Sequence, residues 1–287
     1  MAPSGRSIPS GGITLPPEPV LIPRALTVAG SDSGGGAGIQ ADLKTFAVLG
    51  VWGMSAVTSL TVQNTKGVSA VSDVPAEIVG AQIRAVATDI GVDAAKTGML
   101  SSVEIVEAVA RAVTDASINK LVVDPVFVSK HGHPLLRTDA VESLRRLILP
   151  LATIVTPNLP EASGLARFDV ATRDDMRRAA DAILGLGARS VLIKGGHLEG
   201  ASADDLFVDS ERAEWLTAPR VDTRHTHGTG CVLSAAIAAY LARGDDFFEA
   251  VRKGKEFVTE AIRAGLEIGE GIGPVSPSWR LMGRRQD

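Results

Sequence analysis

The sequence predicts a single α/β domain built on one doubly wound, mostly parallel sheet with helices on both faces. Short apolar runs alternate with helix-period segments from Ala25 onward, and no linker interrupts that alternation. The chain is also large enough, because 287 residues with 45% hydrophobic content can bury the core that such a sheet requires. We therefore expect residues 25–287 to form one domain.

The first half of this pattern predicts four strands and three helices. Runs rich in Val, Ala and Thr that end at Gly, Pro or Asp are typical of strands, whereas apolar residues spaced by three and four are typical of helices. The expected strands are 25–30, 54–62, 93–98 and 120–126, and the expected helices are 38–49, 75–89 and 102–114. Their alternation indicates parallel βαβ units.

The second half continues the alternation and adds a hairpin. The stretch "DLFVDSERAEWLTA" joins two short apolar runs through polar turn residues, which is typical of an antiparallel hairpin. In chain order we expect helix 139–149, strand 153–157, helices 158–165 and 174–186, strand 190–196, the hairpin 205–218, and helices 230–242 and 247–266.

The first 24 residues differ from the rest of the chain. Residues 1–24 are rich in Pro, Gly and Ser and show neither helical nor strand periodicity. We predict a mobile N-terminal arm that is dispensable for folding and activity.

Composition excludes several classes of function. With 29 basic and 33 acidic residues spread along the chain and 4% aromatic residues, no basic stripe or base-stacking platform predicts nucleic-acid binding. A single cysteine permits no internal disulfide, and no apolar segment is typical of a signal peptide or a membrane span. We expect a cytoplasmic protein that interacts with neither membranes nor nucleic acid.

Unusual polar segments follow successive strands of the predicted sheet. Because ligands bind outside the carboxyl ends of parallel strands, these segments predict one shared site on that rim. In chain order they are "AGSDSGGGAG", "QNTKG", "KTGM", "DPV", "TPNLPEA" and "KGGH".

The glycine-rich segment after the first strand leaves two readings open. Gly34, Gly35, Gly36 and Gly38 precede a helix, so their N–H groups suit an anion, but a tight turn that lets strand and helix pack closely is an equal alternative. A P-loop is excluded, because Gly254-Lys255 is followed by Glu within a predicted helix. A dinucleotide site is weakly indicated, because Gln and Asn stand where a ribose-binding acid is expected.

A carboxylate lies on the apolar face of the helix predicted over 38–49. Ile39, Asp42, Phe46 and Leu49 recur at helical spacing on one face. A satisfied core acid is one explanation, but charged residues are rarely buried unpaired. We expect Asp42 to face a ligand pocket.

Taken together, the segments "AGSDSGGGAGIQADLKTF", "VQNTKGV", "KTGML", "DPV", "TPNLPEA", "KGGH" and "HGTGC" resemble the bacterial hydroxymethylpyrimidine/phosphomethylpyrimidine kinases of thiamine biosynthesis. The resemblance covers residues 25–277 and implies the ribokinase-like fold. It implies phosphorylation by ATP of 4-amino-5-hydroxymethyl-2-methylpyrimidine and then of its monophosphate. It also implies Mg²⁺ as cofactor, K⁺ as a further cation and a homodimer.

The resemblance assigns a role to several residues of this chain. Gln63 is expected to read the pyrimidine through its amide, beside Asp42, Met99 and Val126 in the same pocket. Asp124 and Glu161 are expected to handle the metal, and Lys194 and Asn158 to lie near the nucleotide phosphates, with Lys96 a weaker candidate. Core packing for Met99 and Val126, a snorkelling lysine at position 194, and helix capping by Asn158 and Glu161 are the alternatives.

The segment "HGTGC" opens a predicted helix and holds the only cysteine. The resemblance places the N–H groups of Gly228, Thr229, Gly230 and Cys231 around the transferred phosphoryl group. A helix N-terminus lowers the pKa of a thiol, so we expect Cys231 to act as a thiolate base. A zinc site at these residues is poorly supported, because nothing nearby completes a tetrahedral ligand set.

Two residues depart from the family pattern, and three alternative functions remain. His225 stands where the family commonly has Asn, and His133 replaces an acid. Pyridoxal kinase is the alternative within the superfamily. A nicotinamide-dependent oxidoreductase and a noncatalytic pyrimidine-binding regulator are the alternatives from other classes.

Overall fold

The computed structural model describes residues 21–128, 132, 135–196 and 202–281, which form one nine-stranded sheet in the order β3-β2-β1-β4-β5-β6-β7-β8-β9. The strands from β2 to β7 in that order run parallel, while β3, β8 and β9 are antiparallel to their neighbours. The strands are β1 (Arg24–Asp32), β2 (Trp52–Asn64), β3 (Gly67–Asp73), β4 (Ala94–Thr97), β5 (Leu121–Val123), β6 (Ile154–Val155), β7 (Val191–Ile193), β8 (Ser202–Val208) and β9 (Ala213–Pro219).

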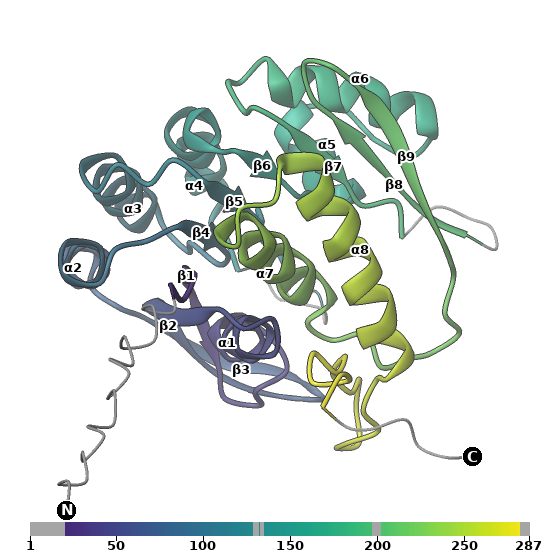
Figure 1. Ribbon diagram of the computed structural model, residues 1–287, viewed down its shortest axis with the longest axis horizontal. Helices are drawn as coiled ribbons and strands as arrows, with labels where there is room; N and C mark the ends of the chain where they lie inside the picture. Colours follow the sequence, from purple (N-terminus) through teal and green to yellow (C-terminus); the bar gives the residue numbers. More distant parts are fainter. Residues whose placement is uncertain (1–20, 129–131, 133–134, 197–201, 282–287) are drawn as a thin grey trace, which may run out of the picture.

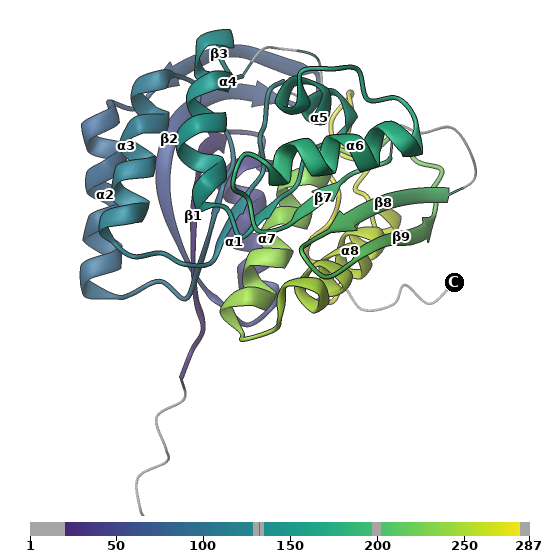
Figure 2. The same ribbon diagram turned by 90° about the horizontal axis from the view of Figure 1, so that it is seen from above.

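Helices cover both faces of the sheet (Figures 1 and 2). The first face packs against α2 (Ala76–Asp89), α3 (Val103–Asp115), α4 (Thr138–Ser143), α5 (Leu159–Ala166) and α6 (Arg173–Leu184), and the second against α1 (Gly38–Val48), α7 (Thr229–Ala242) and α8 (Phe247–Arg263). Strand residues alternate between the two cores, as Leu121 and Val123 enter the first core and Val122 the second. The doubly wound, mostly parallel architecture is confirmed.

Two local predictions differ from the structure. The strand β3 was not predicted, because its side chains are small and largely exposed and its sequence therefore lacks an apolar pattern. The single helix expected over 139–149 is instead α4 followed by a π-helical turn (Leu144–Ile148) and a 3-10 turn (Leu149–Leu151). Pro150 ends the regular hydrogen bonding there, because it has no N–H to donate.

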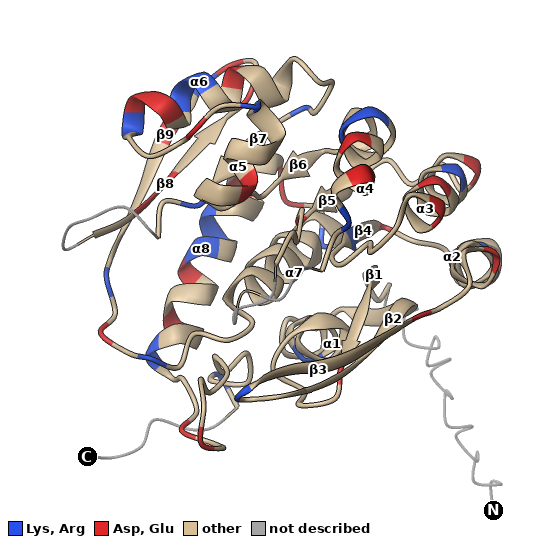
Figure 3. Ribbon diagram, turned by 180° about the vertical axis from the view of Figure 1, so that it is seen from behind, with Lys and Arg blue, Asp and Glu red and all other residues tan. Residues whose placement is uncertain are grey.

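Acidic and basic residues alternate along several of the outer helices in the ribbon (Figure 3). On α6, for example, Arg177 pairs with Asp174 and Arg178 with Asp175. Within the described part of the chain, no helix is both long and apolar enough to cross a membrane.

The strand β1 begins one residue before Ala25, the expected start of the domain. Residues 1–20 of the predicted N-terminal arm lie outside the described residues, but β1 begins at Arg24, whose guanidinium contacts Asp93 at 2.7 and 3.0 Å. Pro23 accepts a hydrogen bond from the Trp52 N–H at 2.8 Å. These contacts connect the last residues of the predicted arm to the sheet.

Deletion of residues 1–20 is expected to leave the melting temperature and the activity near those of the full chain, since the composition of these residues offers no core-forming pattern. Deletion of residues 1–24 is expected to lower the melting temperature, because it removes Arg24 from its ion pair with Asp93. Thermal unfolding and activity measurements on both deletions would check this. A large loss of either quantity in the shorter deletion would contradict the prediction.

Candidate active site

A cavity of about 710 Å³ lies at the carboxyl edge of the parallel strands. Its lining comes from all six polar segments that were expected to converge and from the first turn of α7, so the predicted convergence of these segments is confirmed. The predicted site residues that line it are Gln63, Lys96, Met99, Asp124, Val126, Asn158, Glu161, Lys194, Gly228, Thr229, Gly230 and Cys231.

The glycine-rich segment binds a carboxylate of its own chain. The N–H groups of Gly34, Gly36 and Ala37 donate to the side chain of Asp32 at 2.8, 3.0 and 2.9 Å. Burial opposes ionisation of Asp32, but its bond to His227 and these N–H groups outweigh burial and hold its pKa below the ordinary value. The segment is therefore a tight turn around Asp32, and these three N–H groups already have an acceptor.

Two glycines allow backbone segments to approach closely. A Cβ at Gly38, which has φ of 56°, would collide with the carbonyl oxygen of Gly30, and one at Gly228, which has φ of 80°, with that of Gly36. The left-handed conformation also favours glycine at both positions. These contacts join the glycine-rich turn directly to the start of α7.

The Asp32 carboxylate continues into a chain of buried polar groups. His227 Nε2 lies 3.0 Å from Asp32 Oδ2 and 3.2 Å from the amide nitrogen of Gln63. The other amide atom of Gln63 lies 3.2 Å from Thr61 Oγ1. Neither Asp32 nor His227 was assigned a role from the sequence, although both occur in the motifs that predicted the site.

Asp42 does not line the cavity. Its fully buried carboxylate lies 3.0 Å from Lys96 Nζ and accepts a hydrogen bond from Thr27 Oγ1 at 2.6 Å. Burial tends to lower the pKa of Lys96, but the acidic groups around it, with Asp42 first among them, together outweigh burial and raise that pKa, so the ammonium group stays charged. The expected ligand contact of Asp42 is thus replaced by an ion pair that places Lys96 in the cavity wall.

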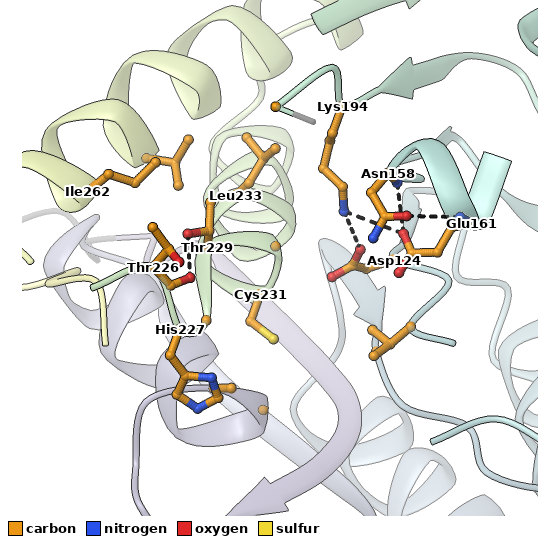
Figure 4. A pocket seen from close by; sticks show the side chains of 18 of the residues that line it. Asp124, Asn158, Glu161, Lys194, Thr226, His227, Thr229, Cys231, Leu233 and Ile262 are labelled. Atoms are coloured by element: carbon orange, nitrogen blue, oxygen red, sulfur yellow. Dashed lines mark hydrogen bonds and ion pairs between the residues drawn. The ribbon is translucent and has the colours of Figure 1, made fainter. Parts of the chain in front are cut away.

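Three charged groups meet at the opposite wall (Figure 4). Lys194 Nζ lies 3.0 Å from Asp124 Oδ1 and 3.8 Å from Glu161 Oε2. Burial would lower the pKa of Lys194, but the two carboxylates raise it and keep the ammonium group charged. Burial raises the pKa of Glu161 to about 7, against the effect of Lys194. The sequence had placed these residues at three different strand ends, and the structure brings them together.

Glu161 also performs the capping role that was its alternative explanation. Glu161 N–H donates to Asn158 Oδ1 at 2.9 Å, and Asn158 N–H donates to Glu161 Oε2 at 2.8 Å. This reciprocal pair begins α5 and fixes the carboxylate against the cavity. Helix capping by Glu161 and a role for its carboxylate in the cavity are therefore compatible.

The carboxylates suit a magnesium ion that is held mainly by water and phosphates. Mg²⁺ prefers hard oxygen ligands and commonly takes only one or two protein carboxylates, which Asp124 and Glu161 can supply. Among the described residues, no group of three or more His, Cys, Asp or Glu side chains has the arrangement of a protein-only metal site. His225 Nδ1 accepts from Gly273 N–H and His227 Nε2 contacts Asp32, so neither of these two nitrogens is free to bind a zinc ion together with Cys231.

The first turn of α7 faces the Lys194 cluster across the cavity (Figure 4). Gly228 is the N-cap of this helix, and Gly230 lies close to both Asp124 and Lys194. Burial raises the pKa of the Cys231 thiol to about 12, and the positive charge of Lys96 opposes this only in part. The expectation of a lowered pKa is therefore wrong, because desolvation of the sulfur outweighs the opposing charge of Lys96.

The cavity extends past the predicted residues toward α8. Asp205 and Lys255 form a buried ion pair of 2.7 Å there, beside Val258 and Ile262. These residues were missed, because a helix-period pattern does not show which face of α8 borders a cavity. Two residues depart from the family pattern. His225 accepts a hydrogen bond from Gly273 N–H at 3.2 Å and does not line the cavity. His133 lies outside the described residues.

The fold and the site together define a small-molecule kinase of the ribokinase-like class. The ADP complex of Bacillus subtilis pyridoxal kinase matches with a TM-score of 0.85 at 42% identity, over 91% of this chain and 99% of that one. The family model described as phosphomethylpyrimidine kinase matches residues 32–276, and the chain belongs to this family.

Two curated relatives carry related names. The hydroxymethylpyrimidine/phosphomethylpyrimidine kinase of Streptomyces coelicolor is 56% identical over 94% of this chain and 99% of its own. A thiamine biosynthesis bifunctional protein of Geobacter sulfurreducens is 48% identical over 88% of this chain and 51% of its own length. The family and these relatives favour a kinase over the oxidoreductase and the noncatalytic regulator.

Proposed function

We propose that the chain phosphorylates 4-amino-5-hydroxymethyl-2-methylpyrimidine with ATP, and then its monophosphate, to supply the pyrimidine diphosphate of thiamine biosynthesis. The observation that carries this proposal is one cavity with three features. Its wall contains the side-chain amide of Gln63, the N-terminus of α7 at Gly228, and the ammonium group of Lys194 between two carboxylates. The relatives from Streptomyces coelicolor and Geobacter sulfurreducens support this substrate class over pyridoxal.

In each transfer the substrate oxygen forms a bond to the γ-phosphorus of ATP, and the bond from that phosphorus to the β-γ bridging oxygen breaks. ADP leaves, and the proton of the first substrate's hydroxyl group passes to a base. The N–H groups at the start of α7 would bind the transferred group and stabilise its oxygens. Magnesium, held by Asp124 and Glu161 through water, would neutralise phosphate charge.

Cys231 remains our proposed proton acceptor for the hydroxyl group. It lies in the first turn of α7, lines the cavity, and has the positive charge of Lys96 nearby. With a pKa of about 12 the sulfur is mostly a thiol at neutral pH. We propose that the small thiolate fraction, whose proton has passed to solvent water, accepts the hydroxyl proton, which leaves Cys231 as a thiol after the transfer. Lys96, paired with Asp42, is the cation positioned to stabilise it.

ADP production with magnesium-ATP should be highest for hydroxymethylpyrimidine and its monophosphate, lower for pyridoxal, and absent for ribose. A continuous assay with all four compounds at equal concentrations would measure this order. Preference for pyridoxal would favour the alternative within the superfamily, and preference for ribose would contradict the proposed substrate class.

A Gln63→Leu variant in the same assay is expected to lower kcat/KM for hydroxymethylpyrimidine by about tenfold to hundredfold, because the amide contacts are lost and the ligand's polar edge is left unpaired. The KM for ATP should change little. Equal effects on both substrates would show that Gln63 acts only through the structure.

The proposal extends to the cations, the cellular compartment and the oligomeric state of the enzyme. We propose a Mg²⁺-dependent enzyme that uses K⁺ as a further cation and works in the cytoplasm as a homodimer. Three exposed apolar side chains of β2, those of Trp52, Leu60 and Val62, support the dimer.

A further inference from the structure

The hydrogen bonds around Gln63 form a chain that can run in only one direction. Asp32 accepts N–H groups from the glycine-rich turn, and its Oδ2 also lies 3.0 Å from His227 Nε2. An ionised carboxylate can only accept hydrogen bonds, so His227 Nε2 must carry a hydrogen and donate it. This holds for the neutral Nε2–H tautomer and for the imidazolium.

A nitrogen that donates cannot also accept from an amide NH₂ group. The amide atom of Gln63 that lies 3.2 Å from His227 Nε2 must therefore be an acceptor, the amide oxygen, which shares the single Nε2 hydrogen with Asp32. The nitrogen and oxygen of an amide have nearly the same shape, so chemistry rather than shape assigns them. The amide oxygen thus faces His227, and the NH₂ group faces Thr61.

The hydrogen bonds of Thr61, at the other end of this hydrogen-bond chain, agree with this orientation of the amide. Thr61 Oγ1 lies 2.9 Å from the carbonyl oxygen of Ser31, to which it donates its only hydrogen. Its lone pairs can then accept a hydrogen from the Gln63 amide, 3.2 Å away. Every group from the glycine-rich turn to Ser31 is satisfied in this direction. A hydroxyl group can also donate, so Thr61 alone would allow either orientation.

The backbone holds His227 firmly in this chain. His227 N–H donates to Gly273 O at 3.1 Å, and Val275 N–H donates to His227 O at 3.0 Å. The imidazole is buried against Gly36, where a Cβ would lie 2.5 Å from the ring. His227 therefore cannot turn away to free the amide.

We propose that the Asp32–His227 pair fixes the Gln63 amide so that it selects an aminopyrimidine over the corresponding oxopyrimidine. The Asp32–His227 pair engages one lone pair of the amide oxygen, and Thr61 engages one hydrogen of the NH₂ group. The amide therefore keeps one acceptor lone pair and one donor hydrogen for the ligand. The oxygen accepts from an exocyclic amino group, and the NH₂ group donates to the neighbouring ring nitrogen. This inference rests on the proposed function and makes His227 a positioning residue for specificity.

The 4-oxo counterpart of hydroxymethylpyrimidine tests the inference, because its ring N–H and carbonyl present the reverse order of donor and acceptor. Wild-type enzyme should favour the amino compound in kcat/KM by at least about a hundredfold, since two hydrogen bonds are mismatched. Near-equal use of the two compounds by the wild type would overturn the proposal without any variant.

A His227→Phe variant keeps bulk but removes the donor, so the amide can reverse. Its amino-to-oxo ratio of kcat/KM should fall at least about tenfold below that of the wild type. His227→Gln is the matched control, because its NH₂ group can donate to both Asp32 and Gln63, and it should retain the ratio. A purely structural role would lower both rates and leave the ratio unchanged, which would overturn the proposal.

If His227→Phe does not fold, His227→Met serves in its place, because it also removes the donor beside the Gln63 amide. Its amino-to-oxo ratio should fall at least about tenfold below that of the wild type. An unchanged ratio in folded His227→Met would contradict the proposal. Failure of the wild type to phosphorylate either compound would instead refute the proposed function.

Discussion

Replacement of Lys194 by methionine is expected to lower kcat/KM by roughly 10²–10³-fold, the usual effect of removing one preorganised charge from a transition state. Lys194 is the cation between Asp124 and Glu161, and it faces the helix N-terminus at which we place the transferred group. Without it, the phosphates would meet two carboxylates with no protein cation between them. Steady-state kinetics with magnesium-ATP would measure the loss.

The same substitution should also destabilise the fold, because it leaves two buried carboxylates without their cation. A Lys194→Met, Glu161→Gln double variant removes one of those charges and should recover part of the melting temperature without recovering activity. Lys194→Arg preserves the charge and should be the least affected variant in both assays. Near-wild-type turnover in a folded Lys194→Met protein would show that this lysine is only structural.

Replacement of Cys231 by alanine is expected to lower kcat by about 10²–10⁴-fold with little change in ATP affinity, if the sulfur accepts the hydroxyl proton. The N–H groups of Gly228, Thr229 and Gly230 remain in this variant, so positioning of the phosphoryl group survives. Cys231→Asp should recover part of the rate, because a carboxylate can accept the proton. Cys231→Ser should not, because its hydroxyl is too weak an acid. Full activity in folded Cys231→Ala would defeat the assignment of a base.

The raised pKa of Cys231 makes a separate, pH-dependent prediction. Since only the thiolate reacts, alkylation at neutral pH should be slow and should rise about tenfold for each pH unit below the pKa of about 12. An ordinary cysteine would instead reach its full rate near its own, lower pKa. Bound pyrimidine should slow the reaction by covering the sulfur. A rate that levels off near neutral pH would show that the thiol ionises readily, contrary to the effect of burial.

The sequence predicted most of the architecture because the architecture depends on local periodicity. Alternating apolar runs and helix-period segments indicate which residues face a core, and this predicted the parallel strands and their helices. The same reasoning failed at β3, whose exposed small residues give no pattern, and at residues 144–151, where the hydrogen-bonding register changes within one apolar stretch. Pairing with β2 and packing against α3 decide those regions.

In the candidate site, too, the sequence determined some features and the tertiary structure decided others. The sequence by itself determined that six polar segments meet at one rim, because strand ends in a parallel sheet share an edge. Only the tertiary structure decided how these groups pair: Asp42 with Lys96, Lys194 with Asp124, and Asp32 with His227, 195 residues apart. Charge pairing and desolvation depend on distances of a few ångströms between segments far apart in the chain. For this reason the pKa of Cys231, unlike its position, could not be derived from the order of the residues.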